Sequence, residues 1–397
     1  GVVSSTEVFD CYFSKKIDRC YESINISGCS GVLWGYNSTG CVDSMYIDNC
    51  SGLTNCFGCV NLRNKSYCWN NIQLSSEEYN NRLQSIKGSF SSIEKEKGIF
   101  KKLCLENPTK ENHNLKVVDC LGDYLTECKN TQQSFEVTNT EDSKWLFSTR
   151  DTKDSYGAIG YSINSERLLE VVSTGYTSKA IGCFACELST DLEYCISCFP
   201  SNNNLLGCDS LKNSSYCILN KQYTKEEYEK LREHIINELT DLGVYGLMLP
   251  PELSPFGYNE TIGQDNMPLT KEQALKLGFK WQDDIQKTIG KETLSVENIP
   301  DHIDDTTEDI INEILTCIDC QRNYKITEQE LFFYKRMKIP IPRECFFCRH
   351  KNRIEKRGPY KFWDRKCAFC KKDIVTNYAP GRPEMVYCEE CYKREVL

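Results

Sequence analysis

The chain has 397 residues, 40% of them hydrophobic and 26% charged, and its formal net charge is −9. This composition is typical of a globular protein of two or three domains, and the negative charge argues against nonspecific binding of polyanions by the whole molecule. No run of the sequence approaches the roughly 18 apolar residues that a membrane span needs, so we expect no membrane contact.

The amino-terminal part of the chain contains regularly spaced cysteines. Cys11, Cys20 and Cys29 are nine residues apart, and so are Cys41, Cys50, Cys59 and Cys68. An apolar residue often stands three places before the thiol, and Ser, Asn, Gly and Asp lie between. Short apolar runs separated by turn residues predict very short strands. We therefore expect residues 1–74 to form a parallel β-solenoid with coils of about 18–22 residues, and a pair of meander-type sheets is the alternative.

The same unit occurs twice. The segment that starts at Phe57, "FGCVNLRNKSYCWNNIQLSSEEYNNRL", matches "LGCDSLKNSSYCILNKQYTKEEYEKLR", which starts at Leu206. This duplication predicts a second cysteine-containing β-solenoid over residues 112–223. Each copy runs into a predicted helix, roughly 75–100 and 224–240, that opens with Ser or Thr before a Glu-Glu pair.

We expect these helices to cap the solenoids and to protect strand edges. The first capping helix and its connector occupy residues 75–111. The second capping helix and a packed linker, with one short helix near 271–277, occupy residues 224–306.

The repeat cysteines have two interpretations. Free cysteine is among the most buried residue types, so the thiols can fill the core. A ladder of thiols could instead hold a soft metal or an iron–sulfur cluster. Most thiols stand singly, which favours core filling. The tightest group is Cys183, Cys186, Cys195 and Cys198.

Two four-cysteine patterns predict zinc modules at residues 307–358 and 359–397. In each module one Cys-x2-Cys pair is followed, after an insert, by another. Four thiolates at this spacing form a closed tetrahedral zinc site with no open position. We therefore predict two structural zinc ions in treble-clef or zinc-ribbon modules, with these ligands: Cys317, Cys320, Cys345 and Cys348; Cys367, Cys370, Cys388 and Cys391.

These modules resemble known bacterial zinc-binding domains. The first is similar to a pattern with a Thr-x2-Glu-x2-Phe-Tyr helix and a Pro-x2-Cys-x2-Cys-Arg segment, matched by Thr327, Glu330, Phe333, Tyr334, Pro342 and Arg349. The second resembles a zinc ribbon that ends in Arg-Pro-x3-Tyr-Cys-x2-Cys, matched by Arg382, Pro383, Tyr387, Cys388 and Cys391. As a whole the chain resembles a family of uncharacterised proteins from candidate-phylum bacteria, with cysteine-rich repeats in front of zinc ribbons. That resemblance implies no activity.

A basic and aromatic segment lies between and around the zinc sites. From Arg343 to Lys372 there are eleven Lys or Arg and three Asp or Glu, a net charge of +8. Cations beside aromatic rings can contact phosphates and stack on bases. The same cations could instead neutralise the zinc thiolates or form a solvated helix face. The candidate contacts to RNA or DNA are Arg349, Lys351, Arg353, Lys356, Arg357, Lys361, Trp363 and Arg365.

The sequence favours a binding protein over an enzyme. It contains no P-loop, no His-Glu-x2-His and no Gly-x-Ser-x-Gly motif. We expect a cytoplasmic zinc-binding protein that contacts nucleic acid through the basic segment, since zinc thiolate sites favour a reducing compartment. A protein–protein scaffold built on the β-solenoid and a soft-metal or redox protein are the alternatives.

Overall fold

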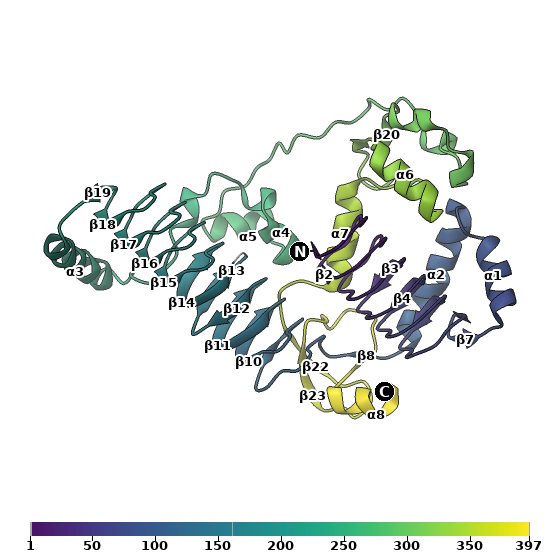
Figure 1. Cartoon of the computed structure of the whole chain (residues 1–397), viewed down its shortest axis with the longest axis horizontal. Coiled ribbons are helices and arrows are strands. Elements are labelled where there is room, and N and C mark those ends of the chain that lie inside the picture. Colours follow the sequence, from purple (N-terminus) through teal and green to yellow (C-terminus); the bar gives the residue numbers. More distant parts are fainter. Residues whose placement is uncertain (1, 161, 397) are drawn as a thin grey trace. The chain divides into compact units, whose positions relative to one another are not determined.

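The computed structural model describes residues 2–160 and 162–396. This part is mainly β and contains eight α-helices. It forms two compact units, each of which we describe by itself (Figure 1). The first unit comprises Gly1–Glu111, Glu260–Pro268 and Gln282–Leu397, and the second comprises Asn112–Asn259 and Leu269–Trp281. None of the described helices is long and apolar enough to cross a membrane.

The first unit begins with a stack of very short strands, which we call the first stack (residues 2–73) and whose strands are parallel except for the last, an antiparallel partner of the strand before it. Successive segments pair twelve residues apart, as in Leu33 with Met45 and Met45 with Phe57. The predicted coil length is therefore too long, and parallel pairing excludes the meander alternative. The strands are β1 (Val2–Val3), β2 (Ser14–Lys15), β3 (Leu33–Tyr36), β4 (Met45–Asp48), β5 (Phe57–Val60), β6 (Cys68–Trp69) and β7 (Ile72–Gln73).

A repeat of three residues explains the length of the coil. Every third side chain is buried inside it, as in the run Ile17, Cys20, Ser23, Ile26, Cys29 and Val32. Four such triplets make one coil of twelve residues. The nine-residue spacing of the cysteines therefore corresponds to three triplets, and not to half of a coil of about 18 residues. The residue before each inward position usually has a positive φ, for example 61° at Gly28 and 51° at Asn49. Gly and Asn adopt this left-handed conformation most readily, which explains why they precede the thiols.

Small polar side chains fit inside the coil because they replace missing backbone hydrogen bonds. The Ser23 hydroxyl donates to the Tyr21 carbonyl at 2.9 Å and accepts from the backbone N–H of Gly35, one coil further on, at 2.9 Å. Thiols do the same, since Cys50 Sγ lies 3.3 Å from the Asp48 carbonyl oxygen. A buried thiol in this position acts as a small, weakly donating core residue.

An apolar column lies on the outside of the first stack. It contains the residues found every twelve positions, and it is buried by the rest of the first unit: Tyr21, Leu33, Met45, Phe57 and Trp69. The ring centroids of Phe57 and Trp69 stack 4.1 Å apart. The column packs against helix α2 (Phe90–Glu106) and helix α6 (Glu328–Met337), through Phe100, Phe333 and Tyr334 among others.

The second unit contains a longer stack of strands, which we call the second stack (residues 115–222) and whose strands are parallel except for the last, an antiparallel partner of the strand before it. Its parallel segments pair eleven to thirteen positions apart, as in Leu121 with Gln132, Lys129 with Glu141 and Arg150 with Ile163. Figure 1 shows the strands side by side, with helix α3 (Lys225–Asp241) beyond their last pair. They are β9 (Leu121–Asp123), β10 (Lys129–Phe135), β11 (Thr138–Phe147), β12 (Arg150–Lys153), β13 (Tyr156–Ile159), β14 (Ile163–Val172), β15 (Ser178–Ile181), β16 (Thr190–Glu193), β17 (Asn203–Leu206), β18 (Ser215–Ile218) and β19 (Lys221–Gln222).

Both stacks end in the same way, as the duplication predicts. The side chain of Asn71 accepts from Val60 N at 2.9 Å and donates to Val60 O at 3.0 Å. Asn220, the equivalent residue of the second copy, makes the same pair of bonds to Asp209 at 2.8 and 2.9 Å. Each amide thus stands in for the next strand and satisfies backbone groups at the end of the stack.

The helices that follow the stacks start at the predicted capping residues. Ser75 and Thr224 form capping boxes with Glu78 and Glu227. The first predicted helix is interrupted, because α1 (Ser76–Gln84) ends before Gly88, whose φ is +93°. A side chain at Gly88 would meet the His302 ring at 2.7 Å, so the break lets this segment approach the chain near residue 302 closely.

The remaining elements are short. In the second unit the linker forms α5 (Lys271–Lys276), near the predicted helix at 271–277. In the first unit they are β8 (Thr109–Lys110), α4 (Ile262–Asn266), β20 (Leu315–Thr316), β21 (Asn323–Tyr324), α7 (Phe346–Arg357), β22 (Trp363–Lys366), β23 (Asp373–Thr376), β24 (Val386–Tyr387) and α8 (Glu389–Val396). Single 3-10 turns cover Pro251–Leu253, Tyr258–Glu260, Val296–Asn298, Ile303–Asp305 and Glu308–Ile311.

Candidate metal centres and the basic helix

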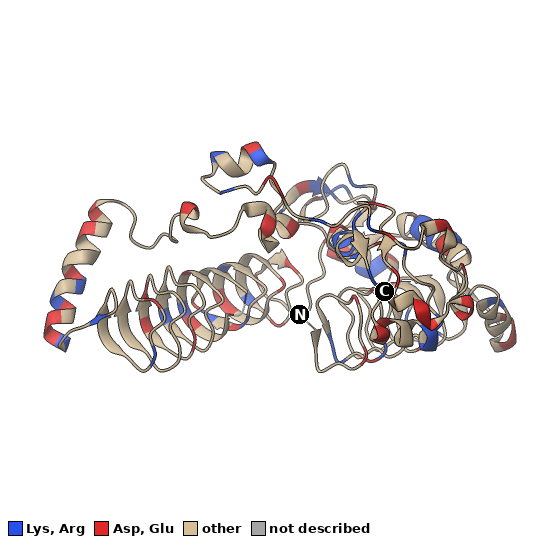
Figure 2. Ribbon diagram, turned by 90° about the horizontal axis from the view of Figure 1, so that it is seen from above, with Lys and Arg blue, Asp and Glu red and all other residues tan. Residues whose placement is uncertain are grey.

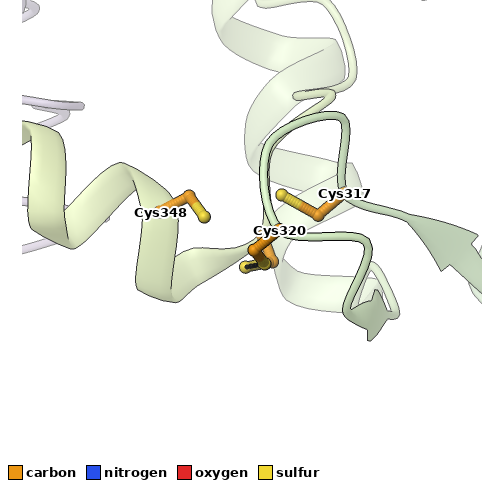
Figure 3. A group of neighbouring side chains, drawn as sticks. Cys317, Cys320 and Cys348 are labelled. Carbon is orange, nitrogen blue, oxygen red and sulfur yellow. Dashed lines mark hydrogen bonds between the residues drawn. The ribbon is translucent and has the colours of Figure 1, made fainter. Parts of the chain in front are cut away.

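The first four-cysteine group is built by a hairpin and a helix start. Cys317 and Cys320 lie in the turn between β20 and β21, and Cys345 and Cys348 lie at the start of α7. Figure 3 shows Cys317, Cys320 and Cys348 pointing toward one another from these two elements. The turn is held by the backbone N–H of Gln321, which donates to the Cys317 carbonyl at 3.0 Å.

The second group repeats this plan. Cys367 and Cys370 lie in the turn between β22 and β23, and Cys388 and Cys391 lie at the junction of β24 and α8. The backbone N–H of Ala368, the residue after Cys367, donates to the carbonyl of Val386 at 2.8 Å. Val386 lies two residues before Cys388, the third cysteine of the group. Ile318 bonds Arg343 in the same way at 3.1 Å in the first group. The two sites therefore share one local design.

The sulfur geometry of both groups fits a four-coordinate ion. In each group the four Sγ atoms lie within 4.8 Å of one another. The pairs Cys320–Cys345 and Cys370–Cys388 are separated by 3.7 Å. A tetrahedron with zinc–sulfur bonds of about 2.3 Å has edges of about 3.8 Å. Both groups can hold a metal ion, and all eight predicted ligands belong to them.

Backbone donors prepare the second group for metal. Burial alone would raise the pKa of Cys367, but the N–H groups of Cys388, Cys370 and Phe369 outweigh it and lower that pKa to about 6. The Cys388 N–H lies 3.2 Å from Cys367 Sγ. Because metals bind the thiolate form, a low thiol pKa favours binding at neutral pH.

The cysteines of the second stack do not form such a group. Within residues 2–160 and 162–396, the two groups at the carboxyl end are the ones whose ligand atoms converge this closely. The thiols of Cys183, Cys186, Cys195 and Cys198 each lie 3.3–3.5 Å from the carbonyl oxygen two residues earlier. All four are 0% exposed. They have the bonds and the burial of core residues.

The structure places the predicted nucleic-acid contacts in two environments. Arg349, Arg353 and Arg357 are buried, with 4–6% of their surface exposed, and Lys356 is partly buried. The other four are on the surface or half-buried: Lys351, Lys361, Trp363 and Arg365. Acidic and basic residues are intermixed along the ribbon of both units (Figure 2).

Two buried arginines of α7 form ion pairs with the first stack. Arg349 Nε donates to Asp10 Oδ2 at 2.9 Å, and Arg353 Nη2 donates to Asp10 Oδ1 at 3.1 Å. Arg353 Nη1 also lies 2.8 Å from Glu22 Oε1. These guanidinium groups are engaged inside the unit. The prediction of phosphate contact therefore depends on the four residues that remain accessible.

The end of α7 is held by rings as well as by charges. Lys356 Nζ lies 3.3 Å from Asp48 Oδ2 and 3.4 Å from the centre of the Tyr36 ring. Arg357 Nη1 donates to the Tyr12 hydroxyl at 3.1 Å. Cations placed over rings in this way are stabilised by the ring quadrupole once water is excluded.

The acidic partners were missed because the coil length was wrong. Asp10 and Glu22 are twelve residues apart, so they stack on adjacent coils, both at left-handed positions with φ of 54° and 49°. A twelve-residue period applied to the sequence would have aligned them. The second group is anchored to the same stack by Tyr392 of α8, whose hydroxyl donates to Asn61 Oδ1 at 2.7 Å and accepts from the Asn49 side chain.

Comparison with known proteins gives no family for this chain. No protein-family model matches it, and no curated protein matches it. Among solved structures, a Desulfovibrio desulfuricans G20 protein provisionally titled an acetyltransferase aligns over 60% of this chain and 67% of its own length, with 10% identity and a TM-score of 0.10. A score this low carries no argument about fold or activity.

Proposed function

We propose that the protein is a non-catalytic binding protein whose carboxyl-terminal modules are stabilised by two structural zinc ions. The observation that carries this proposal is the convergence of two cysteine tetrads, in each of which the four Sγ atoms lie within 4.8 Å of one another and one Sγ–Sγ pair is 3.7 Å apart. Four thiolates leave no open coordination position, so each ion would contribute folding free energy and no Lewis-acid chemistry. We further take the two modules to be treble clefs and the two stacks to be β-solenoids.

Metal analysis tests the zinc proposal. Purified protein should contain two zinc ions per chain, and Cys388→Ser should reduce this to about one, because three thiolates bind structural zinc poorly. Cys104→Ser is the matched control, since Cys104 belongs to neither tetrad. A zinc content that Cys388→Ser leaves unchanged, or a different bound metal, contradicts the proposal.

We propose a protein as the binding partner. All three arginines of α7 are buried in the first unit and are unavailable to phosphates. Apolar side chains next to the first tetrad are instead exposed: Ile318 by 51%, Phe346 by 54% and Phe347 by 60%. Clustered apolar residues of this kind, beside a rigid metal knuckle, are typical of a protein interface.

Site-directed variants distinguish this surface from the rest of the molecule. A stoichiometric complex purified from the native cell should be lost with Phe346→Ser/Phe347→Ser while the zinc content stays at two. Phe332→Ser is the control, because Phe332 is 65% exposed but lies on α6, which carries none of the ligands. If both variants retain the complex, the proposed interface is wrong.

Nucleic acid is the second candidate partner, through the accessible part of the basic segment. Lys361 Nζ lies 5.4 Å from the centre of the Trp363 ring, an arrangement that suits a phosphate beside a stacked base. Retention on heparin and on mixed RNA or DNA should fall with salt, and Lys351→Glu/Lys361→Glu should reduce it at constant zinc content. Retention that does not respond to salt or to this variant removes the candidate. The buried arginines are unsuitable for this test because their loss disturbs the fold.

A further inference from the structure

The second unit contains an apolar cavity of about 610 Å³ at the end of its stack. Its walls come from three parts of the unit: the ends of β16 to β18, helix α3, and the segment that follows α3. A volume of this size lies within the range of about 300–1,000 Å³ that is typical of small-molecule sites. The lining is mostly aliphatic and includes Leu206, Ile218, Leu239, Val244, Met248 and Pro250.

Local backbone geometry keeps the cavity open. Gly207 has a φ of +63°, and a Cβ there would lie 3.0 Å from the Leu219 side chain. The absence of a side chain at this position leaves space in the cavity. The segment after α3 is fixed across the stack by the Gly246 N–H, which donates to the Tyr194 hydroxyl at 2.7 Å. The wall that the segment after α3 forms is therefore held in place by a hydrogen bond to the stack.

The charged groups around the cavity are already satisfied. Arg232 donates through Nε and Nη2 to the two carboxylate oxygens of Glu193, both at 2.7 Å. The Tyr245 hydroxyl donates to Glu193 Oε1 at 2.7 Å. A charged ligand would lose its hydration and find no matching group in the aliphatic lining, which is unfavourable.

We propose that this cavity binds an uncharged apolar small molecule, such as a hydrocarbon chain. The lining chemistry selects for apolar surface, and the concave shape with three walls encloses a compact ligand better than a flat protein partner. Leu219 and Leu247 lie at its rim with 77% and 56% of their surface exposed, and a bound ligand would cover them. This site is independent of the zinc modules, since all of its residues belong to the second unit.

Fluorescence titration of the full chain with N-phenyl-1-naphthylamine, an uncharged dye that brightens outside water, tests the site. Saturable binding of one dye per chain is expected. Leu219→Gln/Leu247→Gln should weaken it roughly tenfold, because both substitutions replace apolar contact with the dye by polar surface. Neither residue is part of the packed core, so the variant should fold.

Leu242→Gln is the matched control, since Leu242 is 73% exposed but does not line the cavity. It should bind the dye like the unaltered chain, and zinc content should be equal in all three proteins. Equal binding by the variant and the control, or a signal that does not saturate, overturns the proposal. Light scattering that shows a dimer lost in the double variant also overturns it, because a second copy then fills the cavity.

Discussion

Asp10 and Glu22 face two arginines in a part of the first unit from which water is largely excluded. Arg349, Arg353 and Glu22 are at most 8% exposed. Only 4% of the Asp10 side chain is accessible. Charges in such a place are costly unless they are paired with good geometry. Because Asp10 bridges the two guanidinium groups, the four side chains act as a unit that fixes the position of α7 on the first stack.

Removal of one member of this network should be strongly destabilising. Arg353→Ala leaves Glu22 without its closest partner, and we expect a loss of about 3–5 kcal/mol in the free energy of unfolding of the first unit. Chemical denaturation followed by tryptophan fluorescence measures it. Lys351→Ala, one exposed position on the same helix, should change the free energy by less than about 0.5 kcal/mol. Equal effects of the two substitutions would show that the network is not structural.

The same network should make stability depend on pH. Burial raises the pKa of Glu22 from its ordinary value of 4.5 to about 7, although Arg353 opposes the shift. The folded state therefore binds a proton more tightly than the unfolded state does, so the contribution of Glu22 is fully present below about pH 4.5 and is lost as the pH rises toward 7.

A comparison of the unaltered chain with Glu22→Gln isolates this effect. The amide cannot titrate, so the stability difference between the two proteins should change by about 1–3 kcal/mol in favour of Glu22→Gln between about pH 5 and pH 8. Thermal unfolding at the two pH values measures it, and zinc-linked effects cancel because they are common to both proteins. A difference that is constant with pH would place the Glu22 pKa near its ordinary value.

At the scale of elements, each stack is closed by an asparagine and a helix. Asn71 and Asn220 end the ladders, and Tyr79 of α1 and Tyr228 of α3 then cover the last coil, with ring contacts to Trp69 at 5.9 Å and Tyr216 at 5.7 Å. The exposed edge that would otherwise invite pairing with another chain is thus covered twice. Both copies of the duplicated segment therefore contain the asparagine and the helix tyrosine that close the stack.

Asn71→Ala should destabilise the first stack by about 2 kcal/mol, because it removes two hydrogen bonds to Val60 and places alanine in the left-handed region. Hydrogen exchange at β5 and β6 should increase in parallel. Asn80→Ala, an exposed change inside α1, is the control and should be close to neutral. Unchanged exchange at β5 would mean that α1 alone closes the stack.

The sequence was sufficient for elements with local chemistry. Capping boxes, paired Cys-x2-Cys turns and the duplicated segment each depend on residues close in sequence or on direct repetition, and the structure has the corresponding elements. The coil length was not predictable in the same way. Nine and twelve are both multiples of the three-residue repeat. The cysteine spacing alone therefore could not show that the coil has twelve residues and not about 18–22.

The contacts of α7 were hidden for a different reason. The period of four that places Arg349, Arg353 and Arg357 on one face is visible in the sequence, but it is shared by a nucleic-acid surface and by a buried ionic face. Only the position of Asp10 and Glu22, near the opposite end of the chain, decides between them. Long-range pairing of this kind follows from tertiary packing and not from local pattern.

At the scale of the molecule, all eight predicted ligands belong to the first unit. The helices that carry the second pair of each tetrad, α7 and α8, also contact the first stack through Arg353 and Tyr392. Any metal that these groups hold is therefore linked to the packing of the first stack, whereas the second stack contains no comparable group among its described residues.

Removal of metal should consequently act on one unit. After treatment with 1,10-phenanthroline, hydrogen exchange should increase in α6 to α8 and in the first stack, while residues 115–222 remain protected. Restoring zinc should reverse the change, since structural zinc contributes directly to folding. A loss of protection that is equal in both units would contradict the independence of the second stack.

The first unit is built from both ends of the chain, with the second unit inserted between them, and this has a consequence for biosynthesis. The usual rule that the amino-terminal domain finishes first is reversed, because the first stack leaves the ribosome long before Cys388 and Cys391 are made. At about 5–20 residues per second, that delay amounts to tens of seconds. Helix α2 follows the first stack directly and can cover part of the column from Tyr21 to Trp69 early, but the part that packs against α6 stays uncovered until the second unit has been made, so a chaperone should bind the nascent chain there.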